Sequence, residues 1–139
     1  MTGLLPGRRN SFVIIPHEHQ GAACLEALDL AKKIVELASD KQASDIVMLD
    51  LRQISMLADF FVICSASSER QLTALQDGIV DEIRNDAHRR PARREGRSSS
   101  GWVLLDYGDV VVHLFSPAER DYYGLEELWS EASPMIRVQ

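Results

Sequence analysis

Two runs of strand-forming apolar residues, separated by a short polar segment, constrain the fold of this chain more than any other feature. The runs lie at 102–105 and 110–115, and Asp-Tyr-Gly-Asp stands between them at 106–109. This pattern is typical of a β-hairpin, in which Gly108 can supply the positive φ that many tight turns need. A core requires the apolar runs, but it does not require Trp102 at the start of the hairpin or acidic residues around Tyr107 at the tip. Because a hairpin tip is exposed, we expect this segment to recognise a partner.

Length and composition predict one soluble domain. The chain has 139 residues, of which 45% are hydrophobic and 26% charged, and a chain of this size buries roughly two-thirds of its unfolded surface. No apolar run approaches the ~20 residues of a membrane span. Arg8 and Arg9 precede an apolar run at 12–15 that is too short for a signal peptide. We therefore expect a cytoplasmic protein.

Charge is unevenly distributed. The net charge of -6 argues against a general nucleic-acid binder, which is normally basic. Residues 102–139 contain two basic residues against seven acidic ones, namely Asp106, Asp109, Glu119, Asp121, Glu126, Glu127 and Glu131. This C-terminal third is predicted to receive a basic partner.

The two cysteines, Cys24 and Cys64, do not form a disulfide framework. Cys64 lies in an apolar strand-like run, where a thiol usually behaves as a small hydrophobic group.

The remaining pattern predicts an α/β domain. Ser68 and Gln71 form a capping box, and Ser116-Pro117 with Glu119 marks another helix start. The expected elements are a helix over 22–39, strands at 45–51 and 59–65, a helix from 69 to about 86, the hairpin, a last helix with a buried stripe of Leu125, Leu128, Trp129 and Ala132, and a terminal strand at 135–138. The order α-β-β-α-β-β-α favours a mixed β-sheet with helices packed mainly on one face. Residues 1–21 are expected to be a flexible extension, and 22–139 the domain.

The search for an active site finds little. No Walker loop, G-x-G-x-x-G or G-x-S-x-G is present. Asp45 and Asp50 are five positions apart along a strand, which is an odd spacing, so they are expected on opposite faces. Asp106 and Asp109 are closer to a plausible pair, although both suit a turn. His113 is expected to be a hydrogen-bonded structural residue, and we predict no catalytic residue, metal site or cofactor.

A basic segment at 88–100 interrupts the periodic pattern. It contains Arg89, Arg90, Arg93, Arg94 and Arg97, together with Ser, Gly and Pro. The segment is predicted to be a solvated loop. It has enough arginines for an auxiliary contact with rRNA phosphates, but it lacks interleaved aromatic residues on which bases could stack.

Several motifs in order resemble the ribosomal silencing factor family, also called Iojap-like. They are Ala-Asp-Phe-Phe-Val-Ile at 58–63, Ser-Glu-Arg-Gln at 68–71, Glu-Gly at 95–96, Gly-Trp-Val-Leu-Leu-Asp-Tyr-Gly-Asp-Val-Val-Val-His at 101–113 and Tyr-Tyr-Gly-Leu-Glu-Glu-Leu-Trp at 122–129. The match runs from about residue 25 to 132, and its hairpin string is specific to the family. The sequence departs from the common pattern in two places: the first 20 residues lie outside the match, and the arginine-rich segment is unusually basic.

The resemblance implies a nucleotidyltransferase-like α/β fold without catalysis. It implies binding to large-subunit ribosomal protein fourteen, which blocks joining of the small and large subunits and so represses translation. It also implies a homodimer when free, and a link to large-subunit biogenesis. On the match to the family's hairpin, Trp102, Asp106, Tyr107 and Asp109 are the expected contact group, with Trp and Tyr as anchors and the carboxylates facing Lys or Arg of the partner.

Two alternatives remain open at this point. One is a metal-dependent nucleotidyltransferase-like enzyme that uses the hairpin carboxylates, against which the absence of a Gly-Ser loop followed by a same-face Asp pair counts. The other is a plain RNA-binding module, which the acidic balance disfavours.

Overall fold

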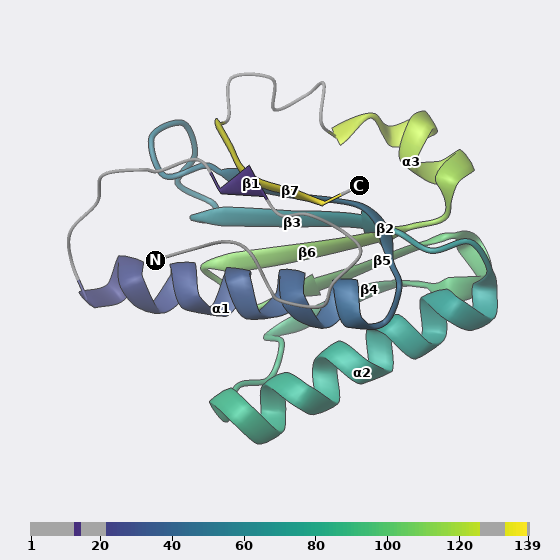
Figure 1. Cartoon of the computed structure of the whole chain (residues 1–139), viewed down its shortest axis with the longest axis horizontal. Coiled ribbons are helices and arrows are strands. Elements are labelled where there is room, and N and C mark those ends of the chain that lie inside the picture. The colour runs from purple at the N-terminus through teal and green to yellow at the C-terminus, as the bar shows by residue number, and fades with distance from the viewer. Residues whose placement is uncertain (1–12, 15–21, 126–132, 139) are drawn as a thin grey trace.

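The computed structural model describes residues 13–14, 22–125 and 133–138, and Figure 1 shows how the elements are arranged. In chain order they are β1 (Val13–Ile14), α1 (Ala22–Asp40), β2 (Ser44–Asp50), β3 (Phe60–Ser65), α2 (Glu69–Ala87), β4 (Arg93–Arg97), the 3-10 helix η1 (Ser98–Ser100), β5 (Trp102–Asp106), β6 (Val110–Phe115), α3 (Pro117–Tyr123) and β7 (Ser133–Val138). The predicted order of helices and strands is present, with β1 and β4 added. No described helix is long and apolar enough to cross a membrane.

The strands form one mixed sheet in the order β1-β7-β2-β3-β6-β5-β4. The pair β3 and β6 is parallel, whereas the other neighbouring pairs are antiparallel. The mixed sheet is therefore confirmed, as is the terminal strand predicted at 135–138. The parallel pair lies at the centre, and every residue of β3 and β6 is buried. This burial explains why both strands are continuous apolar runs rather than alternating ones.

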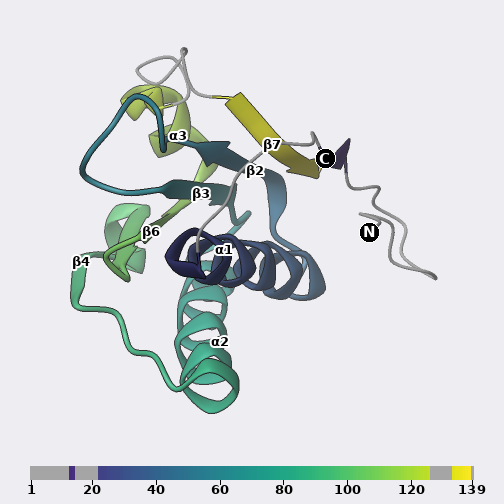
Figure 2. The same cartoon turned by 90° about the vertical axis from the view of Figure 1, so that its left-hand side faces the viewer.

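Helices α1 and α2 pack together on one face of the sheet, whereas α3 lies on the opposite side (Figures 1 and 2). The larger core fills the space under α1 and α2 and includes Ile34, Phe60, Leu75 and Val112. A smaller apolar cluster, which includes Leu49, Phe61 and Phe115, lies on the opposite face. The prediction of helices mainly on one face is confirmed, and it leaves a sheet face that α1 and α2 do not cover. We call it the helix-free face because neither of these two long helices covers it, and only the short helix α3 lies on that side.

The predicted helix starts are present. The Ser68 hydroxyl accepts a hydrogen bond from the Gln71 amide at 3.0 Å, and the Gln71 side chain reaches back to the Ser67 amide at 2.7 Å. Gln71 Nε2 also donates to the Gln42 carbonyl at 2.9 Å, which links the start of α2 to the turn after α1. Ser116 caps α3 in the same way, with Pro117 as its first residue.

The predicted last helix begins where expected, but it does not continue without a break past Tyr123. Helix α3 ends at Tyr123, because Gly124 adopts a left-handed conformation at φ 56° and donates its amide to the Arg120 carbonyl. Leu125 packs against the smaller apolar cluster. The other residues of the predicted stripe, Leu128, Trp129 and Ala132, lie outside the described residues.

Two segments predicted to lack regular structure contain strands. Residues 93–97 form β4 and pair with β5 along their whole length, so the prediction of a loop over 88–100 is wrong there. All five residues of β4 are exposed, and no apolar alternation marks the strand in the sequence. In the expected N-terminal extension, β1 pairs with β7 at the other edge of the sheet.

Candidate partner-binding surface

The predicted hairpin is present, and its turn is built as the sequence indicates. Tyr107 donates its amide to the Val110 carbonyl at 2.9 Å, which closes the turn between β5 and β6. Gly108 has φ 95° and open space where a Cβ would stand. Its amide donates to Asp106 Oδ1 at 2.7 Å, a local hydrogen bond typical of Asp at turns.

Tyr107 does not project from the tip. Its side chain is only 4% exposed and belongs to the core under α1 and α2, so the prediction of an exposed ring is wrong. Burial raises the pKa of its hydroxyl to about 12, an effect that Arg94 and Arg89 partly offset. The ring faces the helices because Tyr107 follows β5 by one residue, in phase with the buried Val103 and Leu105.

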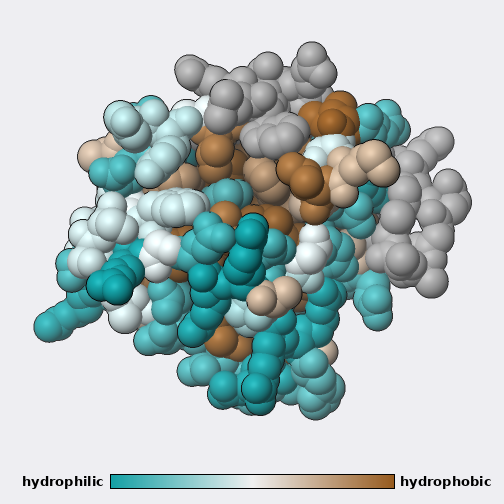
Figure 3. Space-filling view, turned by 180° about the vertical axis from the view of Figure 1, so that it is seen from behind, coloured by the Kyte–Doolittle hydropathy of each residue, from teal (hydrophilic) through white to brown (hydrophobic). Residues whose placement is uncertain are grey.

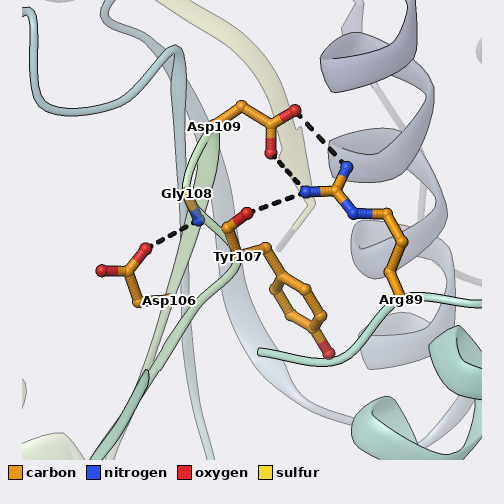
Figure 4. Close-up of polar contacts among 5 residues, drawn as sticks. All are labelled: Arg89, Asp106, Tyr107, Gly108 and Asp109. Carbon is orange, nitrogen blue, oxygen red and sulfur yellow. Dashed lines mark hydrogen bonds and ion pairs between the residues drawn. The ribbon is translucent and has the colours of Figure 1, made fainter. Parts of the chain in front are cut away.

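Arg89 holds the turn in place (Figure 4). Its guanidinium donates to both Asp109 carboxylate oxygens, at 3.0 and 3.4 Å, and to the Tyr107 carbonyl at 2.8 Å. Both side chains of the pair are about 30% exposed, at 31% and 28%. Arg89, predicted as an rRNA contact, and Asp109, predicted as a partner contact, are therefore bonded to each other inside this protein.

Asp106 lies at the end of β5 on the helix-free face. It pairs with Arg93 at 3.4 Å, and its side chain remains 23% exposed. Arg93 is 61% exposed and also contacts Glu95 at 3.2 Å. Such a pair between exposed groups is worth little in free energy, so a partner cation could replace Arg93 at small cost.

Trp102 stands at the opposite end of β5 from the turn. Asp106 is four positions further along the strand, which corresponds to a distance of about 13 Å. Its ring lies 5.8 Å from that of Tyr123, and Tyr123 lies 5.8 Å from Phe115. The expected contact group therefore does not form one cluster, because Trp102 joins an aromatic group from α3 and β6 instead.

A stripe of half-buried side chains connects these two ends. Burial alternates along β5, so that Trp102, Leu104 and Asp106 are partly exposed on the helix-free face while the residues between them are buried. We call these three residues the β5 stripe. Trp102 and Leu104 pack on the smaller apolar cluster beneath them. A partly exposed Trp on a flat, rigid strand has the properties of an interface anchor.

Further exposed apolar side chains occur on the molecule. Tyr123, beside Trp102, is 44% exposed, and Tyr122, whose ring contacts that of Tyr123, is 81% exposed. Met56 and Leu57 are strongly exposed in the β2–β3 connection. Figure 3 shows apolar side chains gathered on the upper part of one face, above a strongly hydrophilic part. Sequence reasoning identified Tyr122 and Tyr123 only as part of a family motif. Their spacing after Pro117 could have placed them near the end of a short helix, but not beside Trp102.

His113 lies on the helix-free face of β6, between aromatic rings. Its ring centroid is 4.7 Å from that of Phe61 and 6.2 Å from that of Phe115. Neither ring nitrogen has a hydrogen-bond partner among the described residues, so the expectation of a hydrogen-bonded histidine is wrong. Burial lowers the pKa of His113 to about 4, which the Asp106 carboxylate partly opposes. The imidazole is therefore neutral at pH 7.

The carboxylates considered for catalysis do not converge. Asp50 is buried and accepts two hydrogen bonds from the Arg52 guanidinium, at 2.9 and 2.8 Å. Among the described residues, no group of three His, Cys, Asp or Glu side chains is placed to hold a metal ion. Cys64 is buried, and burial raises the pKa of its thiol to about 12, which confirms its interpretation as a small hydrophobic residue.

Comparison with known proteins decides the family. The sequence profile of "ribosomal silencing factor during starvation" matches residues 25–139. The chain belongs to the ribosomal silencing factor family. It is 42% identical to ribosomal silencing factor RsfS of Halalkalibacterium halodurans over 114 residues, which cover 80% of this chain and 93% of that protein.

Two further similar proteins extend the comparison. A crystal structure of a Chromobacterium violaceum protein superimposes with a TM-score of 0.66 at 36% identity, covering 76% of this chain and 85% of that one. A mouse protein named "mitochondrial assembly of ribosomal large subunit protein 1" is 31% identical over 70% of this chain and 43% of its own length. The likeness to nucleotidyltransferases stays a prediction.

Proposed function

We propose that this protein binds the large ribosomal subunit through ribosomal protein fourteen, blocks joining of the small subunit, and so represses translation in the cytoplasm. Membership of the silencing factor family supports a role on the ribosome. The name of the mouse relative supports the large subunit as partner, and also supports a contribution to its biogenesis.

The observation that carries the proposal is the β5 stripe with the aromatic residues beside it. Trp102, Tyr122 and Tyr123 present aromatic surface at one end, and Asp106 presents a carboxylate at the other. Trp and Tyr are enriched at the energetic centres of interfaces. A carboxylate at the margin suits a basic partner such as a ribosomal protein.

In this proposal the turn between β5 and β6 orders the binding surface but is not its centre. The buried Tyr107 and the Arg89–Asp109 pair fix the end of β5, so the stripe is already ordered before binding. Preorganisation lowers the entropic cost of association. Asp109 keeps 28% exposure and remains a proposed contact at the edge of the surface.

The decisive experiment measures subunit joining. Separated large and small subunits are mixed with increasing amounts of the protein, and the fraction of complete ribosomes is followed by sucrose-gradient sedimentation. We expect the protein to co-sediment with large subunits and to lower the ribosome fraction in proportion to occupancy. Normal ribosome formation on large subunits saturated with the protein would refute the proposal.

Repression by obstruction needs no chemical step, so we propose that the protein is not an enzyme. Incubation with Mg²⁺ and nucleotides tests this directly. We expect no saturable nucleotide binding and no turnover. Saturable nucleotide binding or turnover would instead support the nucleotidyltransferase-like alternative.

A further inference from the structure

We propose that the outer edge of the sheet, formed by β4 and the segment before it, binds the phosphate backbone of RNA through Arg90, Arg94 and Arg97. On the large subunit this RNA would be rRNA next to the docked protein, so this inference rests on the proposed function. We call these three residues the arginine edge.

The structure divides the five arginines of this segment into two groups. Arg89 is bonded to Asp109 and Arg93 to Asp106 and Glu95. In contrast, Arg90, Arg94 and Arg97 have no acidic partner among the described residues, and all three are exposed. Three guanidinium groups without an acidic partner among the described residues therefore lie within eight positions of one another in a chain whose net charge is -6.

Strand pairing places these cations around the edge of the sheet. Arg94 pairs with Leu105, whose side chain is buried under the helices, whereas Arg97 pairs with Trp102 on the helix-free face. Because cross-strand partners share a face, Arg94 and Arg97 extend from opposite sides of the same strand. Arg90 precedes the strand. A polyanion running along the edge could contact all three.

The backbone of β4 adds possible hydrogen-bond donors. β4 is the last strand of the sheet, so its outer N–H groups face away from β5. The adjacent η1 consists of three serines, of which Ser99 is exposed, whereas Ser100 donates its hydroxyl to the Arg97 carbonyl at 2.8 Å. Arginine, serine hydroxyl and backbone N–H groups are the usual donors to phosphate oxygens, and the guanidinium fork matches phosphate geometry.

An acidic peptide that adds to β4 as a further strand fits the edge less well. Gly96 has φ 80°, which interrupts the extended backbone along which a new strand would run. A Cβ atom at Gly96 would stand 2.2 Å from the Trp102 carbonyl oxygen, so the pairing of β4 with β5 requires glycine at this position. An RNA backbone needs no continuous ladder of hydrogen bonds.

The test compares two triple variants of equal charge change. The first is Arg90→Gln/Arg94→Gln/Arg97→Gln. The control is Lys33→Gln/Arg70→Gln/Arg84→Gln, which removes three cations from α1 and α2. Binding to large subunits, to isolated ribosomal protein fourteen and to a labelled RNA duplex is measured between about 50 and 200 mM salt.

We expect the arginine-edge variant to bind isolated protein fourteen like the parent. On large subunits the parent's plot of log affinity against log salt should be steeper than the variant's by about 2 to 3, since each phosphate contact contributes about 0.7 to 0.9. For three contacts with duplex phosphates, the parent should lose roughly 40-fold more affinity than the variant when the salt rises from about 50 to 200 mM. The control variant should keep the parent's slope, and the RNA duplex should bind the parent and the control more tightly than the arginine-edge variant.

Three outcomes would overturn the inference. They are equal salt slopes for parent and arginine-edge variant, equal affinity of both for the RNA duplex, and loss of binding to isolated protein fourteen by the arginine-edge variant. The last result would make the edge a protein contact. Failure of the parent itself to bind protein fourteen would instead refute the proposed partner, while a steeper parental slope on large subunits would still support the arginine edge.

Discussion

Single residues in the hairpin show that position in a turn does not decide exposure. Tyr107 and Gly108 are neighbours at the tip, yet the first is 4% exposed and the second is open to solvent. Trp102, at the start of the hairpin, keeps part of its surface. The aromatic group available to a partner is therefore at the Trp102 end of β5, rather than at the turn.

His113 should make stability depend on pH. Its pKa is about 4 in the folded protein, against 6.5 for the free side chain, so the unfolded chain binds the additional proton. Stability is then complete above pH 6.5 and falls as the pH drops toward 4, by roughly 2 to 3 kcal/mol at pH 4.5. Urea unfolding at pH 7 and pH 4.5 measures this loss.

The variant His113→Leu should remove most of that dependence, since nothing titrates at its position. His88→Asn is the control, because His88 is exposed at φ 56°, a conformation that Asn tolerates. An unchanged pH dependence in His113→Leu would show that another group causes the loss.

Removing the exposed aromatic surface should weaken binding to large subunits. We expect Trp102→Ala to cost ~2 kcal/mol, or roughly thirtyfold in affinity, as for a central interface aromatic. Tyr122→Ala should also weaken binding, and at 81% exposure it leaves the fold intact. Leu57→Ala, with 80% exposure near the other end of the strands, is the matched control. Equal co-sedimentation of a folded Trp102→Ala protein would remove Trp102 from the interface.

At the scale of elements, the hairpin depends on a residue far away in sequence. Arg89 donates hydrogen bonds to the Tyr107 carbonyl, 18 positions later in the sequence, and to the Asp109 carboxylate, 20 positions later. Arg89→Met keeps the aliphatic length and removes these bonds. Since the pair is partly exposed, we expect a loss of about 1 kcal/mol in urea unfolding.

The same change should loosen the turn locally. Exchange of the Tyr107 amide, which bonds to Val110, should accelerate in Arg89→Met by hydrogen-exchange NMR. Arg90→Met is the control, because Arg90 is exposed and has no acidic partner among the described residues. Equal destabilisation by both substitutions would contradict a specific role for Arg89.

Charge reversal at Asp106 and at Arg93 shows whether the acidic or the basic residue contributes more to binding of large subunits. Asp106→Lys and Arg93→Glu break the same 3.4 Å ion pair. Asp106→Lys also removes the acceptor of the Gly108 amide, and Arg93→Glu the contact with Glu95, so the charge of the partner is read from the ranking of variants that are shown to be folded. We expect Asp106→Lys to weaken capture of large subunits more than Arg93→Glu, and the double variant to remain weak although its ion pair can re-form. The reverse ranking would make β4 the main contact. Asp109→Lys should weaken capture as well, but it also breaks the bond to Arg89.

At the scale of the whole molecule, one sheet face carries the packing helices and the other keeps apolar surface. Met56 and Leu57 in the β2–β3 connection and Tyr122 in α3 are exposed apolar side chains at separate places, and exposed apolar surface can mark a protein–protein contact. We therefore expect the free protein to sediment as a homodimer, with twice the chain mass of 15.6 kDa. Sedimentation velocity at micromolar concentrations measures this, and a single species of chain mass would contradict it.

Local sequence determined a large part of this structure. The capping residues Ser68 and Ser116, the central strands β3 and β6 and the turn glycine Gly108 were all predicted, because each depends on interactions within a few residues or on a strong apolar run. The family was likewise identified from motifs. Tertiary structure decided what local patterns could not: the burial of Tyr107, the Arg89–Asp109 pair, the pairing of β4 and the meeting of Trp102 with Tyr123. Each of these depends on contacts between residues distant in sequence, and their free energy is gained only after the sheet has brought them together.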